Sequence, residues 1–128
     1  MGLMSHDSEP VRVEKSWGHE LWVHNDSLYC GKVLHFNCGA KCSLHYHRLK
    51  HETFYLHTGD LYYRLMSLGL ANSKFLQAAI PWILLCPGQV VEVPPGTVHQ
   101  LWAVDSPVDL FEFSTQHFDS DSIRIAEG

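Results

Sequence analysis

The chain has 128 residues, enough for one compact domain with its own apolar core but too few for two full domains. Apolar residues make up 45% of the chain, yet no run approaches the ~20 apolar residues that a membrane-spanning helix needs. The formal net charge of −5 argues against the clustered basic face that binding to nucleic acid requires. We therefore expect no nucleic acid and no membrane among the partners, and look for a small-molecule ligand or a protein partner.

The first ten residues, MGLMSHDSEP, are polar and irregular, and we expect residues 1–10 to form a flexible arm. They lack the basic start and long apolar run of a secretory signal, so we expect a cytoplasmic protein. The four cysteines form no C-x-x-C pair, which favours reduced thiols over a zinc ribbon or a redox dithiol.

From residue 11 onward, short runs rich in aromatic and β-branched residues alternate with Gly, Pro, Asn and Asp, a pattern typical of β-strands. Strands are predicted over residues 11–17, 20–25, 28–36, 42–47, 53–58, 60–66, 74–80, 82–86, 89–94, 98–104 and 108–114. Residues 67–73 and the C-terminal tail, residues 116–128, have only weak helical character, and we expect turns or disorder there. So many short strands within residues 11–115 predict an all-β domain that closes into a barrel or stacks as a sandwich, since an open sheet would leave long edges unpaired.

The segment HYHRLKHE, residues 45–52, concentrates three histidines and a glutamate. Side chains two apart on a strand share a face, so His45 and His47 project the same way from Cα atoms roughly 6.5 Å apart. Glu52 can re-enter the same interior after a short corner. A fourth candidate, His99, follows a Pro-Gly corner that sets the register of the next strand.

These residues carry a resemblance. The spacing of Gly39, His45, His47, Glu52 and Gly59 is that of the first signature of the cupin family, and the spacing of Gly88, Pro94, Gly96 and His99 is that of the second. The resemblance implies a single-domain jelly-roll β-barrel, the double-stranded β-helix, in which His45, His47, Glu52 and His99 bind one divalent metal ion. Three imidazoles and one carboxylate suit Mn, Fe, Co, Ni, Cu or Zn, and the sequence does not choose among them. Ala103 stands where the family pattern often has Asn, a departure that affects no ligand.

The segments VEKSWGHELW, CGKVLHF and CSLHYHRLKHETFYLHTGDL look like the mannose-6-phosphate isomerase-type cupins, although His45 stands where many of those proteins have Gln. This finer resemblance implies an isomerase or epimerase acting on a small sugar or sugar phosphate. Candidates for the proton transfer are Glu112, Lys32 and His35. Lys32 and His35 face opposite sides of one strand, so at most one of them points inward, and Glu112 faces outward if its phenylalanine neighbours face the core.

Arg48 and Lys50, beside the ligand corner, are candidates for binding a substrate phosphate. Two other functions stay open: an Fe(II)-dependent dioxygenase with the same ligands, and a carrier that binds a small ligand without turnover. Trp102 lies at odd separation from His99 and should face away from the metal. Together with the apolar segment PWILL, it predicts an outer apolar patch and a homodimer.

Overall fold

The structure, a computed structural model, describes residues 8–128, so residues 1–7 of the expected arm lie outside the described residues. The strands are β1 (Val11–Lys15), β2 (Gly18–Asn25), β3 (Cys30–Phe36), β4 (Leu44–His47), β5 (Glu52–Thr58), β6 (Leu61–Met66), β7 (Ile83–Leu85), β8 (Val90–Val93), β9 (Val98–Trp102), β10 (Val108–Ser114) and β11 (Ser122–Ala126). Within the described part of the chain, no helix is long and apolar enough to cross a membrane.

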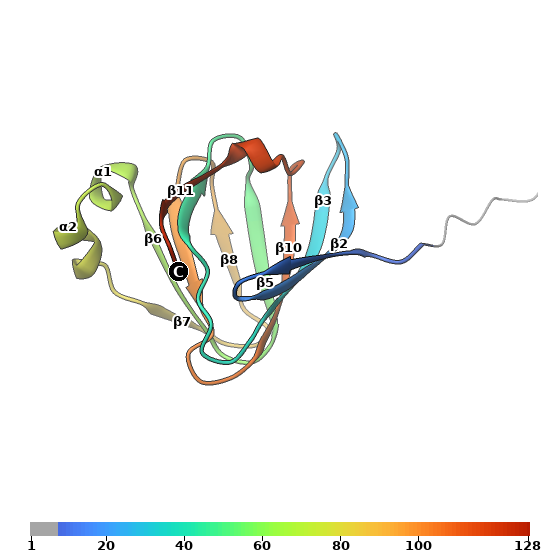
Figure 1. The fold of residues 1–128 in the computed structure, drawn as a ribbon, viewed down its shortest axis with the longest axis horizontal. Helices are drawn as coiled ribbons and strands as arrows, with labels where there is room; N and C mark the ends of the chain where they lie inside the picture. Colours follow the sequence, from blue (N-terminus) through green and yellow to red (C-terminus); the bar gives the residue numbers. More distant parts are fainter. Residues whose placement is uncertain (1–7) are drawn as a thin grey trace, which may run out of the picture.

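Two antiparallel sheets lie face to face (Figure 1). The larger sheet has the order β1-β2-β3-β10-β5-β8, and the smaller has the order β11-β4-β9-β6-β7. Strands that are distant in the chain are therefore neighbours in space, as when β10 pairs with both β3 and β5. The prediction of an all-β jelly-roll fold is confirmed.

The core fills the space between the sheets, and strand alternation explains which residues enter it. Along β3, Lys32, Leu34 and Phe36 are buried, whereas His35 and the other intervening residues are only half-buried on the outer side. The Trp17 ring stacks on Phe36 with centroids 4.2 Å apart, which seals one end of this core. All four cysteines carry free thiols, as the sequence predicts.

Two short helices, α1 (Leu68–Ala71) and α2 (Lys74–Ala79), lie outside the smaller sheet (Figure 1). The prediction of a strand over 74–80 is wrong, and residues 67–73, expected as a turn, include α1. The Ser73 hydroxyl accepts a hydrogen bond from the Leu76 N–H, which caps α2. Arg64 of β6 anchors this helix by donating to the Gln77 carbonyl oxygen at 3.1 Å and to Gln100 Oε1 at 2.8 Å.

The segment 116–128, expected to be turns or disorder, instead contains the 3-10 turn η1 (Asp119–Asp121) and strand β11. Strand β11 pairs with β4, and Ser122 lies opposite His47 in this register. The final strand thus flanks the strand that carries two of the candidate metal ligands.

The outer apolar patch expected around Trp102 is present. Trp102 packs edge-on against Trp82, with ring centroids 5.2 Å apart, and Ile83 and Leu84 are nearly half exposed beside them. The homodimer that this patch suggested stays a prediction.

Candidate metal centre

The two predicted signature blocks meet inside the barrel. His45 and His47 lie on β4, and His45 is the direct cross-strand partner of His99 on β9. One ring nitrogen from each of these three histidines lies within 4.8 Å of the others, so the cluster could hold a metal ion. Glu52, the first residue of β5, lies beside them: its Oε1 is 2.8 Å from His47 Nε2, and its Oε2 is 3.9 Å from His99 Nε2.

The turns before the ligands fix their directions. Pro94 O accepts a hydrogen bond from Thr97 N–H and Gly96 has φ of 79°, as a type II turn requires at its third residue. Gly96 N–H also donates to the His47 carbonyl oxygen at 2.7 Å, which ties the second block to the strand of the first. The other three turn glycines predicted from the signatures have positive φ as well, namely Gly39, Gly59 and Gly88.

Backbone carbonyls select the tautomer of two imidazoles. Nδ1–H of His45 donates to the Ser43 carbonyl oxygen at 2.8 Å, and Nδ1–H of His99 donates to that of Thr97 at 3.1 Å. Because a carbonyl oxygen can only accept, the proton lies on Nδ1 and the Nε2 lone pair of each ring stays free to bind a metal.

The electrostatics of the cluster suit a cation. Burial, reinforced by the neighbouring His99, lowers the pKa of His45 to about 3, and burial also lowers the pKa of His99. Burial alone would raise the pKa of Glu52, but the close polar contact with His47 and the electrostatic effects of His99 and Lys50 lower it. Among the described residues, Glu52 Oε1 has no hydrogen bond of regular geometry although it is buried. The neutral imidazoles of His45 and His99 beside the ionised carboxylate of Glu52 fit a divalent transition metal.

The larger sheet and the corner that precedes β5 supply a second group of polar side chains, which we call the charge row: Glu20, Lys32, Glu112, Lys50 and Glu52. Within it, carboxylates and ammonium groups alternate. Lys32 Nζ is 3.2 Å from Glu20 Oε1, and Lys50 Nζ is 3.1 Å from Glu112 Oε2 and 3.3 Å from Glu52 Oε1. Lys32 and Glu112 are cross-strand partners on β3 and β10, which brings the two groups of ion pairs together.

Glu112 faces inward, because Phe111 and Phe113 lie on the outer side of β10. It is 3% exposed, and its Oε2 accepts a hydrogen bond from the Ser114 hydroxyl at 2.9 Å. Burial and the nearby charge of Glu52 raise the pKa of Glu112, although Lys50 and Lys32 act in the opposite direction. Glu112 is therefore a buried carboxylate suited to exchange a proton.

Lys50 is 2% exposed although it lies in the corner between β4 and β5. Asp121 holds this corner by accepting hydrogen bonds from three successive backbone N–H groups, those of residues 48–50, at 2.9, 2.9 and 3.0 Å. Burial alone would lower the pKa of Lys50, but Glu112 and Glu52 raise it, so the ammonium stays charged.

Two sequence candidates lie elsewhere. His35 is on the outer side of β3, where its Nδ1 is 2.8 Å from Asp109 Oδ1, so the inward member of the Lys32 and His35 pair is Lys32. Arg48 is exposed on the outside of the corner and does not line the cavity, whereas Lys50 does. We therefore withdraw His35 as a proton-transfer candidate and Arg48 as a phosphate ligand.

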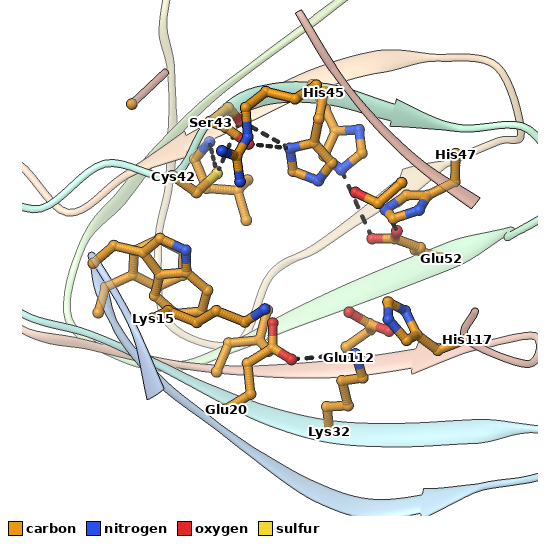
Figure 2. Close-up of a pocket in the computed structure, with 18 of the residues that line it drawn as sticks. Lys15, Glu20, Lys32, Cys42, Ser43, His45, His47, Glu52, Glu112 and His117 are labelled. Atoms are coloured by element: carbon orange, nitrogen blue, oxygen red, sulfur yellow. Dashed lines mark hydrogen bonds and ion pairs between the residues drawn. The ribbon is translucent and has the colours of Figure 1, made fainter. Parts of the chain in front are cut away.

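His117 was missed from sequence, where it reads as an ordinary surface or core histidine. It lines the cavity beside Glu112 (Figure 2). Its Nδ1 is 3.0 Å from Lys50 Nζ. Burial and the charges of Lys50 and Lys32 lower its pKa to about 4, so its ring is a neutral acceptor for Lys50. No sequence pattern predicts this contact, since it depends on the placement of the C-terminal segment.

These groups surround a cavity of about 450 Å³, within the range of ~300–1,000 Å³ of small-molecule sites. Figure 2 shows its two sides, with Ser43 and His45 on one and Glu20 and Lys32 on the other. Lys15, next to the turn between β1 and β2, reaches the cavity from its mouth.

Residues 17–126 match the model of the family described as Cupin. The sequence is also similar to a D-lyxose ketol-isomerase of Thermofilum sp. (strain ex4484_79), with 30% identity over an alignment 126 positions long. The match covers 84% of this chain and 68% of that protein.

Solved structures share the fold. The capsular polysaccharide assembling protein CapF of Staphylococcus aureus superposes with a TM-score of 0.75 at 15% identity, over 92% of this chain and 34% of that chain. KdgF of Halomonas sp. superposes with a TM-score of 0.68 at 15% identity, over 88% of this chain and 98% of that chain. This chain thus spans about a third of CapF, and identities this low show a common fold alone.

Proposed function

The chain belongs to the cupin family, and we propose that it is a metal-dependent sugar isomerase that interconverts an aldose and a ketose by moving a proton between neighbouring carbons. One observation carries the proposal: Lys50 bridges Glu52 and Glu112 at 3.3 and 3.1 Å, which sets a buried proton acceptor beside the candidate metal ligands. The similarity to a protein named as a sugar isomerase supports the reaction class. The likeness of the signature segments to mannose-6-phosphate isomerase-type cupins supports it independently.

A divalent ion held by His45, His47, His99 and Glu52 would act as a Lewis acid on the carbonyl and hydroxyl oxygens of an open-chain sugar. Glu112 takes the proton from C2 as the C–H electrons form the C1–C2 double bond of an enediolate, and it returns that proton to C1. The hydroxyl proton on O2 ends on O1, so the sugar is isomerised with no net gain or loss of protons.

Lys50 is a positioning residue in this scheme. It already contacts Glu112, Glu52 and His117, so its ammonium holds the base in place and keeps the neighbouring carboxylate ionised. The burial of both side chains of the Lys50–Glu112 pair keeps water from competing for the transferred proton.

The test is an isomerase assay on protein loaded in turn with Mn, Fe, Co, Ni and Zn, with product formation from free and phosphorylated aldoses and ketoses followed by NMR in D₂O. We expect turnover with at least one metal, with the proton from C2 retained at C1 and little deuterium taken up from the solvent, because Glu112 is buried. Glu112→Gln should lower kcat by about 10²–10⁴-fold. Glu92→Gln is the matched control, because the Glu92 side chain on β8 is 61% exposed and, within residues 8–128, is hydrogen-bonded only to His51.

Two results would replace the proposal. Oxygen consumption that depends on Fe(II), with no isomerisation, would indicate the dioxygenase. Binding of metal and sugar with no turnover under any condition would indicate the carrier.

A further inference from the structure

The cavity offers few free positive charges. Lys32 is paired with Glu20, Lys50 lies between Glu112 and Glu52, and Arg124 is 3.0 Å from Glu127. Of the four described Lys and Arg side chains that line the cavity, only that of Lys15 has no ion pair. It is exposed at the mouth, where its positive charge contributes to lowering the pKa values of Glu20 and Asp119.

Carboxylates also outnumber cations around the cavity. Six acidic side chains line it, namely Glu14, Glu20, Glu52, Glu112, Asp119 and Glu127, against the four basic side chains of Lys15, Lys32, Lys50 and Arg124. A sugar phosphate would bring about two more negative charges into this surrounding. A divalent ion at the ligand cluster would only balance the formal excess of two acidic groups. A phosphate would also find no unpaired arginine guanidinium, the group that binds phosphate through two parallel hydrogen bonds, among the described lining residues.

Glu20 and Lys32, by contrast, present a neutral pair with unused hydrogen-bonding capacity. Trp22 Nε1–H and Lys32 Nζ both donate to Glu20 Oε1, at 2.8 and 3.2 Å, and the Lys32 ammonium lies 4.4 Å from the centroid of the Trp22 ring. No hydrogen bond or ion pair within residues 8–128 engages Glu20 Oε2, although the side chain lines the cavity and is only 12% exposed. The pair can therefore accept from one sugar hydroxyl at Oε2 and donate to another from Nζ.

The position of this pair matches the far end of a sugar chain. Glu20 is on β2 and Glu52 is on β5, which are separated in the sheet by β3 and β10. With strands ~4.8 Å apart, about 14 Å separates the axes of β2 and β5, and both side chains reach inward into the space between. Figure 2 shows Glu20 and Lys32 facing His45 and Ser43 across the cavity.

We propose that the substrate is an uncharged, unphosphorylated sugar, and that Glu20 and Lys32 form the subsite that binds its hydroxyl groups remote from the metal ligands. This inference rests on the proposed function, whose metal and base act at the other end of the sugar. Lys32 becomes a substrate-binding residue in place of the proton-transfer role expected from sequence, and Lys50 becomes a positioning residue in place of a phosphate ligand.

The test compares kcat/KM of the metal-loaded protein for D-lyxose, D-xylulose, D-mannose and D-fructose with the values for D-mannose 6-phosphate and D-fructose 6-phosphate. We expect at least a tenfold preference for free sugars over phosphate esters. Lys32→Met and Glu20→Gln should each raise KM for the best free sugar about tenfold, with a smaller change in kcat. Lys74→Met, an exposed position on helix α2 that does not line the cavity, should leave the free-sugar values unchanged.

A second measurement does not need turnover. Binding of D-arabinitol, the alditol of D-lyxose, is followed by calorimetry, and we expect Lys32→Met to weaken it about tenfold while Lys74→Met leaves it intact. If phosphate esters are preferred and Lys15→Met abolishes that preference, the inference is overturned while the isomerase proposal stands. If no sugar is isomerised with any metal, the isomerase proposal fails, and equal alditol binding by wild type and Lys32→Met then overturns the inference too.

Discussion

Lys50 is the residue on which the charge row depends, and Lys50→Met tests this directly. At an effective dielectric constant of about 20, an ammonium attracts a carboxylate 3.1–3.3 Å away by about 5 kcal/mol. Desolvation of the three buried groups offsets much of this. Removal of the ammonium leaves Glu52 and Glu112 facing each other with no cation between them. We therefore expect a loss of about 3–5 kcal/mol in the free energy of unfolding.

The assay is urea denaturation of metal-free protein at pH 7 on wild type, Lys50→Met, Glu112→Gln and Lys50→Met/Glu112→Gln. Because the second change removes the unpaired charge, we expect the double variant to regain about half of the lost stability. A Lys50→Met protein within ~0.5 kcal/mol of wild type would refute the reasoning, as would strictly additive effects of the two changes.

Three further results are expected. His99→Ala should abolish uptake of a transition metal, measured by elemental analysis after dialysis, whereas His35→Ala on the outer face should retain it. The pKa of His45 is about 3 in the folded protein, against 6.5 for an unperturbed imidazole. Because the unfolded chain binds more protons than the folded one between these values, the free energy of unfolding of the metal-free protein should fall by up to about 1.4 kcal/mol per pH unit as the pH drops from 6.5 toward 3. His45→Gln should flatten this slope in urea titrations. Asp121→Ala should lower kcat more than it raises KM, because it frees the corner that holds Lys50. Asp121→Asn keeps one acceptor oxygen and should recover part of the loss. Equal kcat in wild type and both variants would contradict this role.

The strands of the fold could be predicted from sequence wherever apolar alternation met a clear turn. Residues 74–80 were the exception, because KFLQAAI is apolar enough for a strand and its helix depends on the Ser73 cap and on the anchor from Arg64. Strand β11 could not be predicted either, since it is stable only by pairing with β4 from the other end of the chain.

Strand spacing predicts that His45 and His47 share a face, whereas Glu52 and His99 joined the predicted ligand set through the resemblance to the cupin signatures. The charge row was only partly accessible. Strand parity reduced Lys32 and His35 to one inward residue without deciding which, and it left Glu112 open in the same way. Lys50 and His117 depend on a corner and a C-terminal segment whose backbone path no periodic pattern describes.

Strand β4 lies between β9 and β11, so both of its hydrogen-bonded neighbours come from the last third of the sequence. Pairings between such distant segments form slowly in folding, because a long loop must close before any contact compensates for its lost entropy. During translation, the strand that carries His45 and His47 therefore waits for residues 98–126 to leave the ribosome. An ion held by this cluster would consequently be captured late, as a finishing step of folding rather than as its nucleus.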